Sequence, residues 1–145
     1  MKKQNYVIVA GTFDLFHVGH IEILRRASKY GKVLAVVNSD RFVKEFKGIT
    51  PTIDEESRAD VVESCKYVHS VYYNDSKDLK NVIDKIVSIY GYNITGVVFG
   101  DDYDLDKYRK QTQITREWQQ QHDIALIQLP RADYISSTDI RRRIK

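Results

Sequence analysis

Residues 6–20 have the sequence YVIVAGTFDLFHVGH, and this stretch decides the fold. Its first five residues form a mainly apolar run that ends at Gly11 and Thr12, which predicts a buried strand at 6–10 followed by a tight turn. Apolar residues at helical spacing come next, at positions such as Leu24 and Ala27, and predict a helix over residues 21–30. The stretch is therefore expected to form a strand, a turn and the beginning of a helix.

Two histidines, His17 and His20, lie three residues apart where this helix is expected to begin. In a helix that spacing places both imidazole rings on one face of the first turn. Free backbone N–H groups and the positive end of the helix dipole favour an anion at the same place. Gly19, between the histidines, allows a bulky group to approach the backbone closely. The spacing predicts a phosphate-binding site.

The histidine pair has two other interpretations. A zinc pair is disfavoured, because metalloprotease histidines lie at i, i+4 with a glutamate between them. Cys65, His69 and His122 show no spacing typical of further zinc ligands. In the second interpretation, the histidines cap the helix or lie on the surface and bind nothing. Phosphate binding is the interpretation that uses every feature of the turn.

Apolar runs alternate with helical patterns along the rest of the chain. Strands are expected at 33–37, 71–73, 96–99 and 124–127, and helices at 55–67, 78–90, 107–122 and from about Ser136. This alternation predicts an α/β fold: a single Rossmann-like domain over residues 1–145, with three layers and a five-stranded parallel sheet. Polar patches at 12–20, 38–40, 100–103 and 131–138 each follow a strand. They are expected to meet at the carboxyl ends of the strands, where such sheets bind ligands.

The composition limits the function classes. With 42% hydrophobic and 30% charged residues, the chain is typical of a soluble globular domain. No apolar stretch approaches the length of a membrane span, so no membrane partner is expected. The net charge of +3 suits small anions, and no basic stripe with interleaved aromatic residues indicates nucleic acid. The one cysteine, Cys65, excludes an internal disulfide and suits the reducing cytoplasm.

The polar patches also resemble those of a known family. Residues 11–20, GTFDLFHVGH, resemble the His-x-Gly-His signature of the nucleotidyltransferase superfamily and of its cytidylyltransferases, particularly the small bacterial glycerol-3-phosphate cytidylyltransferases. Three further patches agree in order, at 38–48, 100–103 and 131–140, so that the resemblance runs from about Val7 to Ile144. It implies transfer of a cytidylyl group from CTP to a phosphorylated alcohol, glycerol 3-phosphate. The products would be pyrophosphate and CDP-glycerol, a precursor of a surface polymer such as teichoic acid.

The resemblance implies roles for individual residues. The residues expected to take part in catalysis are His17, His20, Lys47 and Arg131. Those expected to bind the nucleotide are Gly11, Thr12, Phe13, Gly19, Asp101, Ile135, Ser136, Ser137 and Thr138. Lys44, Arg58 and Lys80 are expected to bind the acceptor substrate, and Asp14 to lie beside the metal. The expected cofactor is Mg²⁺, which bridges phosphate oxygens and needs few protein ligands.

Several of these roles have a structural alternative. Lys44 and Lys47 are expected in a polar loop at 41–52 that closes over a phosphate, and the alternative is a pair of ordinary solvated lysines. Arg58 and Lys80 have the alternative of exposed helix charges. Asp101 also suits a turn for backbone reasons. Ser136 is a predicted N-cap of the last helix, and the alternative for the neighbouring hydroxyl groups is capping alone.

The sequence departs from the family pattern at two places. In the patch at 131–138, Ala132, Asp133, Tyr134 and Ser137 replace Thr, Glu, Gly and Thr, and Tyr134 adds a side chain that would stack on the base or narrow the acceptor pocket. Family members use an arginine and an aspartate for a subunit contact or a buried pair, which implies a homodimer, but Lys66 and His69 replace them here and weaken that inference. The lysine spacing also resembles adenylyltransferases that use ATP on a sugar phosphate or FMN. A nucleotide-binding module without catalysis is the remaining alternative.

Overall fold

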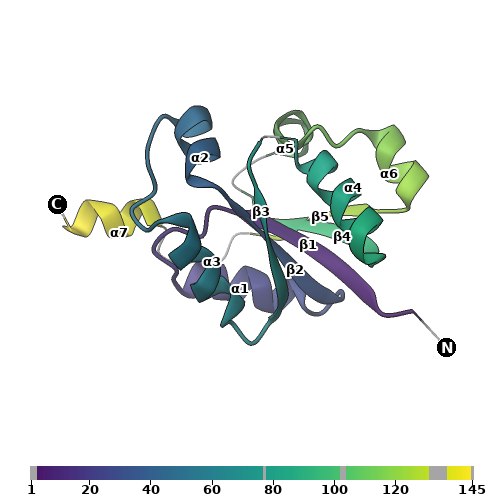
Figure 1. Ribbon diagram of the computed structural model, residues 1–145, viewed down its shortest axis with the longest axis horizontal. Helices are drawn as coiled ribbons and strands as arrows, with labels where there is room; N and C mark the ends of the chain where they lie inside the picture. The colour runs from purple at the N-terminus through teal and green to yellow at the C-terminus, as the bar shows by residue number, and fades with distance from the viewer. Residues whose placement is uncertain (1–2, 77, 102–103, 131–136, 145) are drawn as a thin grey trace.

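Five parallel strands form one sheet in the computed structural model, which describes residues 3–76, 78–101, 104–130 and 137–144. The strands are β1 (Asn5–Gly11), β2 (Lys32–Asn38), β3 (Val68–Asn74), β4 (Asn93–Phe99) and β5 (Ala125–Gln128). Their order across the sheet is β3-β2-β1-β4-β5 (Figure 1). The predicted fold class, a three-layer α/β arrangement around a five-stranded parallel sheet, is confirmed.

One face of the sheet is covered by α1 (Val18–Ala27) and α3 (Glu55–Glu63). Leu24 and Ala27 of α1, together with Val62 of α3, have no exposed surface, because they pack against the alternate side chains of β1 and β2. β2 is buried on both faces, as the continuous apolar run at 33–37 predicts for a central parallel strand.

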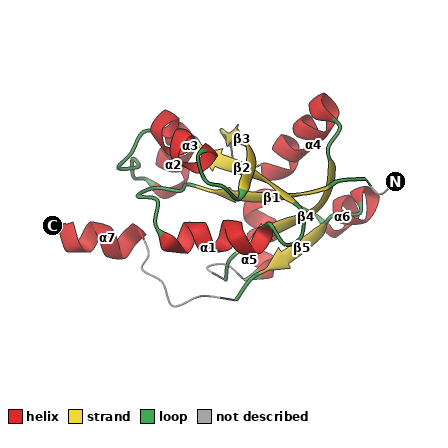
Figure 2. Cartoon of the chain, turned by 90° about the horizontal axis from the view of Figure 1, so that it is seen from below, coloured by secondary structure: helices red, strands yellow, loops and turns green. Residues whose placement is uncertain are grey.

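The opposite face is covered by α4 (Leu79–Tyr90), α5 (Leu105–Thr112) and α6 (Arg116–His122). Ile83 of α4 is fully buried there against Ile8 and Leu34 of the two central strands, and Trp118 of α6 belongs to the same cluster. Figure 2 shows α1 on one side of the sheet and α4 and α6 on the other. The last helix, α7 (Ser137–Ile144), lies outside this packing, near the beginning of α1 (Figures 1 and 2).

Two helix predictions are corrected by the structure. Residues expected in a polar loop form α2 (Asp40–Lys47), which begins after the N-cap Ser39 and ends at Gly48, whose φ is 73°. The single helix expected over 107–122 is two helices, because Gln113 takes a left-handed φ of 64° and Thr115 caps α6. Buried Ile114 fills the corner between them.

The order of the strands creates one topological switch point. The chain passes from β1 outward to β2 and β3, then crosses back to β4 on the other side of β1. Connections from β1 and β4 therefore leave the sheet in opposite directions, and a crevice opens at their carboxyl ends. The turn after β1 carries the histidine pair, and Asp101 follows β4, so these predicted patches lie at the same edge of the sheet.

Candidate functional site

The two histidines cap the helix that follows β1. His17 is the N-cap of α1, and its Nδ1 accepts a hydrogen bond from the backbone N–H of Gly19 at 3.0 Å. The backbone N–H of His17 in turn donates to Nδ1 of His20 at 3.1 Å. This reciprocal pair is a capping box made with imidazoles. The ring centroids lie 4.0 Å apart, so the predicted juxtaposition of the two rings is confirmed.

This capping fixes the tautomer of both rings. A nitrogen that accepts an N–H hydrogen bond carries no proton, so the single proton of each neutral imidazole is assigned to Nε2. Each ring therefore has one N–H donor that the capping box leaves uncommitted. The hydrogen bonds of the Nδ1 atoms to the backbone hold both rings at the N-terminus of α1. The helix dipole favours negative charge there.

The surroundings keep both histidines neutral. Burial lowers the pKa of His17 below its ordinary value. Burial and the neighbouring His17 lower the pKa of His20 to about 4, although the Asp14 carboxylate acts in the opposite direction. Phe16 stacks against the His20 ring at a centroid distance of 5.4 Å. At neutral pH the site therefore presents uncharged N–H donors.

The turn before the helix is held in an uncommon backbone conformation. Phe13 and Leu15 have positive φ angles of 55° and 51°, a region that residues with side chains seldom adopt. Phe13 is 4% exposed and packs in the core with Val9 and Leu24, so its side chain offers almost no surface to a ligand. A contact of Phe13 with the nucleotide, as predicted, would therefore use its backbone.

Asp14 is the hub of the turn. Its carboxylate is 2% exposed and accepts hydrogen bonds from the backbone N–H groups of Thr52, at 2.8 Å, and Ile53, at 3.0 Å. A third hydrogen bond comes from Nη2 of Arg141 at 2.7 Å. Burial alone would raise the pKa of Asp14, but these hydrogen bonds outweigh it and lower that pKa. The carboxylate is ionised and joins three segments.

This arrangement does not fit Asp14 as a direct metal ligand. Both of its oxygens are occupied by protein donors, and the Arg141 guanidinium already supplies a positive charge. Across the described residues, no group of three or more His, Cys, Asp or Glu side chains lies close enough to hold a metal ion. That Asp14 lies beside a metal carried by the nucleotide stays a prediction.

Arg58 lies inside the protein rather than at a substrate surface. It is 1% exposed, and its guanidinium donates to the backbone oxygens of Ile53, Thr12 and Asn38 at 2.6–2.9 Å. A fourth hydrogen bond goes to the carboxylate of Asp40 at 2.6 Å. The predicted substrate contact is thus replaced by a structural role, because Arg58 joins the turn after β1 to the loop before α3.

Polar residues at the ends of β2 and β3 continue this network. Asn38 donates to the hydroxyl of Thr12 at 3.2 Å, and Asn74 donates to Asn38 at 3.4 Å. The Ser39 hydroxyl donates to Asp75, which also forms an ion pair with Arg41. The patch at 38–40 therefore positions the first turn. The sequence predicts this patch at the ligand-binding edge but gives Asn38 and Ser39 no individual role, and it does not reveal that Asn74 and Asp75 take part.

The predicted lysines lie at the periphery. Lys44 and Lys47 are exposed on the last turn of α2, which follows the carboxyl end of β2. Lys80 is half-buried in the first turn of α4, after β3 and on the other face of the sheet. Gly11 ends β1, where an added Cβ would lie 3.3 Å from the Phe13 ring. Asp101 is exposed after β4.

Several predicted residues lie outside the described residues. Arg131, Ile135 and Ser136 belong to this group, as do the substituted positions 132–134. Ser137 and Thr138 form the beginning of α7, and the structure describes only their backbone.

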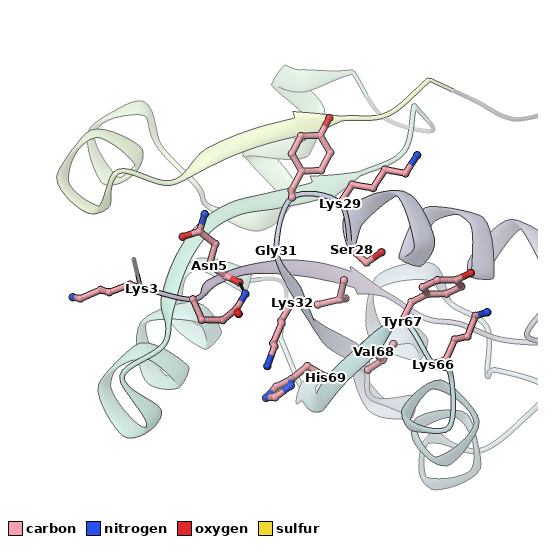
Figure 3. Close-up of a pocket in the computed structure, with 13 residues that line it drawn as sticks. Lys3, Asn5, Ser28, Lys29, Gly31, Lys32, Lys66, Tyr67, Val68 and His69 are labelled. Atoms are coloured by element: carbon pink, nitrogen blue, oxygen red, sulfur yellow. Dashed lines mark hydrogen bonds between the residues drawn. The ribbon is translucent and has the colours of Figure 1, made fainter. Parts of the chain in front are cut away.

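A separate pocket of 790 Å³ lies at the amino ends of the strands (Figure 3). Lys66 and His69 line it, together with Lys3 and Gly31. A Cβ on Gly31 would lie 2.7 Å from the backbone oxygen of Asn5, so glycine is required there. Figure 3 shows Lys3 and Lys66 on opposite sides with their amines directed apart, so these charges do not converge on one anion.

Comparison with known proteins places this geometry in a family. Residues 8–143 match the family model described as cytidylyltransferase-like. The chain belongs to that family. The resemblance predicted from the sequence is therefore confirmed, and the family is one of nucleotidyltransferases. Among the described residues, no helix is both long and apolar enough to cross a membrane.

Curated relatives differ in length and in named activity. The chain is 33% identical to the glycerol-3-phosphate cytidylyltransferase of Bacillus subtilis over 147 aligned residues, covering 99% of this chain and 98% of the relative. It is 36% identical to the bifunctional protein HldE of Koribacter versatilis and to the FAD synthase of Pyrococcus abyssi. The chain spans 22% and 50% of those two relatives.

Solved structures share the fold. A lipopolysaccharide core biosynthesis protein from Thermoplasma volcanium superposes with a TM-score of 0.66 at 22% identity, over 91% of this chain and 99% of that one. A nicotinate-nucleotide adenylyltransferase-like protein from Vibrio parahaemolyticus gives a TM-score of 0.62 at 19% identity, over 96% and 85%. At these identities the likeness concerns the fold.

Proposed function

We propose that this chain transfers the cytidylyl group of CTP to the phosphate of glycerol 3-phosphate. The observation that carries the proposal is the pair of neutral imidazoles, each left with an Nε2–H donor at the beginning of α1. The near full-length likeness to a relative named glycerol-3-phosphate cytidylyltransferase supports the choice of nucleotide and acceptor. The products are CDP-glycerol and pyrophosphate.

The reaction needs positioning and charge stabilisation more than covalent chemistry. An oxygen of the acceptor phosphate attacks the α-phosphorus of CTP and forms a P–O bond. The bond from that phosphorus to the oxygen it shares with the β-phosphorus breaks, and pyrophosphate leaves with the electron pair. The Nε2–H groups of His17 and His20 donate to the phosphate oxygens as negative charge develops on them. No proton has to move, so a low histidine pKa suits this role.

Other residues have supporting roles in the proposal. Lys44 and Lys47 would bind phosphate groups from the end of α2, and Arg131 would offset charge on the reacting phosphates. Ser136, Ser137 and Thr138 would bind the nucleotide at the beginning of α7. Mg²⁺ would enter as part of the CTP substrate, held by its phosphate oxygens rather than by Asp14.

A second candidate is adenylyl transfer from ATP. It is favoured by the 36% identity to an FAD synthase over 74 residues, which cover half of this chain. The two candidates share the histidine pair and differ in the base and the acceptor.

A substrate matrix separates these candidates. Each of the four nucleoside triphosphates is combined, with Mg²⁺, with glycerol 3-phosphate, phosphoethanolamine, a sugar phosphate and FMN, and pyrophosphate release is measured. We expect turnover with CTP and glycerol 3-phosphate. Turnover with ATP but not with CTP would replace the first candidate by the second. Tight nucleotide binding without turnover in any combination would indicate a module without catalysis.

A further inference from the structure

The C-terminal helix is tied to the first turn by one arginine. In α7, three arginines follow one another, at 141, 142 and 143. Arg142 and Arg143 are exposed, whereas the Arg141 side chain is 30% exposed and reaches the Asp14 carboxylate at 2.7 Å. The two residues are 127 positions apart in the sequence. Arg141 therefore differs from the two arginines that follow it, because its side chain contacts the histidine turn.

Asp14 connects that contact to the rest of the site. The same carboxylate holds the loop before α3 through the N–H groups of Thr52 and Ile53. It also lies close enough to His20 to raise the pKa of that ring. With Arg141 bound, the negative charge of Asp14 is matched by a cation from α7. One buried carboxylate thus joins the histidine turn, the loop and the last helix.

The helix itself needs such a contact. α7 has eight residues, and isolated helices of that length are not stable in water. In both ribbon views it begins beside the amino end of α1 and extends away from the sheet (Figures 1 and 2). Docking through a charge-assisted hydrogen bond to an almost fully buried partner would hold the helix and fix where it begins.

We propose that Arg141 is a positioning residue that docks α7 on Asp14 and so holds the beginning of that helix beside the histidine pair. The backbone of Ser137 and Thr138 lies at this beginning. Docking therefore sets the place of a segment that would bind the nucleotide. The kinetic part of this inference rests on the proposed function, whereas docking itself does not.

Hydrogen exchange tests docking without any substrate. In the full chain, the amides of residues 141–144 should exchange about tenfold faster or more in Arg141→Gln than in the wild type, since a charge-assisted contact is lost. Arg142→Gln removes the same charge from an exposed neighbour and should leave the exchange unchanged. Asp14→Asn should speed the exchange of these amides equally. The double variant should add nothing further, because both substitutions remove the same contact between Asp14 and Arg141. Equal exchange in the two arginine variants, or additive effects of Asp14→Asn and Arg141→Gln, would overturn the proposal.

Kinetics with CTP and glycerol 3-phosphate test the consequence. Arg141→Gln should raise the KM for CTP about tenfold and leave kcat within a factor of about two, with partial rescue by Arg141→Lys. A fall in kcat with an unchanged KM would indicate loss of folded protein and would overturn the positioning role. Absence of turnover in the wild type would instead refute the proposed function, and the exchange result would still decide whether Arg141 docks α7.

Discussion

Each histidine of the pair uses its two ring nitrogens for different purposes. Nδ1 of His17 replaces the side-chain oxygen that usually caps a helix, and Nδ1 of His20 completes the capping box. The fold thereby determines which nitrogen carries the proton. The spacing of His17 and His20 predicts that the rings are neighbours. The burial that keeps them neutral depends on Phe16 and the rest of the turn, and spacing alone does not reveal it.

A substitution of His17 separates capping from catalysis. His17→Asn keeps an N-cap acceptor and removes the Nε2–H donor, so the free energy of unfolding should stay within about 1 kcal/mol of the wild type. The value of kcat/KM for pyrophosphate release should fall about a hundredfold, as is typical when one donor to developing charge is lost. His17→Ala should lose both. His69→Asn, at the opposite end of the sheet, is the matched control.

Unchanged kcat/KM in His17→Asn would show that His17 serves only as a cap. An equal loss of activity in His69→Asn would show that the effect is not specific to the site.

The low pKa of His20 predicts that stability depends on pH in a defined window. An unfolded histidine binds a proton below its ordinary pKa of 6.5, whereas folded His20 does so only below about 4. The contribution of neutral His20 to the free energy of unfolding is therefore fully present above pH 6.5. It is lost as the pH falls toward 4, by up to about 1.4 kcal/mol per pH unit. Urea unfolding of the wild type and of His20→Gln measures it. The same slope in both proteins over this window would contradict the assignment.

Between the elements, buried polar side chains hold the loops at the carboxyl edge. Arg58 and Asp14 both hold the loop before α3 at Ile53. Asp14 accepts a hydrogen bond from the Ile53 N–H, and Arg58 donates one to the Ile53 carbonyl. The family resemblance implies a substrate contact for Arg58, and the position of Arg58 in a helix does not reveal that its side chain is buried. The helix position also does not reveal that four acceptors surround the Arg58 guanidinium.

Arg58→Lys tests this structural role. A lysine ammonium cannot match the planar fork of donors, so buried acceptors would lose their partners and the free energy of unfolding should fall by about 3 kcal/mol. Urea unfolding measures the change, and Lys80→Arg, on a half-buried helix position, is the control. Full stability with a raised KM for glycerol 3-phosphate would restore the substrate contact expected from the sequence.

The errors in the helix predictions have local causes that the sequence carries. Ser39 and Gly48 bracket α2 as a cap and a left-handed terminus, and Phe42 and Val43 bury its inner side, but the surrounding charges favoured a loop. The break between α5 and α6 depends on Gln113, a residue that seldom takes a positive φ, so apolar spacing alone joins the two helices. Contacts between distant residues, such as that of Asp14 with Arg141, leave no signal in spacing.

In the whole molecule, the two ends of the sheet carry different sets of polar side chains. Alternating strands and helices suffice to predict the parallel sheet and the edge at which the polar patches gather. The crevice at that edge lies at the switch point between β1 and β4, where the strand order changes direction. The pocket at the other edge is lined by Lys3 and Lys66, whose amines point apart (Figure 3). The homodimer implied by the family resemblance remains a prediction.

Nitrogen-15 NMR of the histidine rings, recorded at pH 7 with and without CTP and Mg²⁺, tests the central claim most directly. The account predicts that His17 and His20 are both neutral with the proton on Nε2, and that CTP shifts the two Nε2 resonances while leaving His69 unaffected. Protons on Nδ1, charged rings, or Nε2 resonances that do not respond to CTP would contradict it.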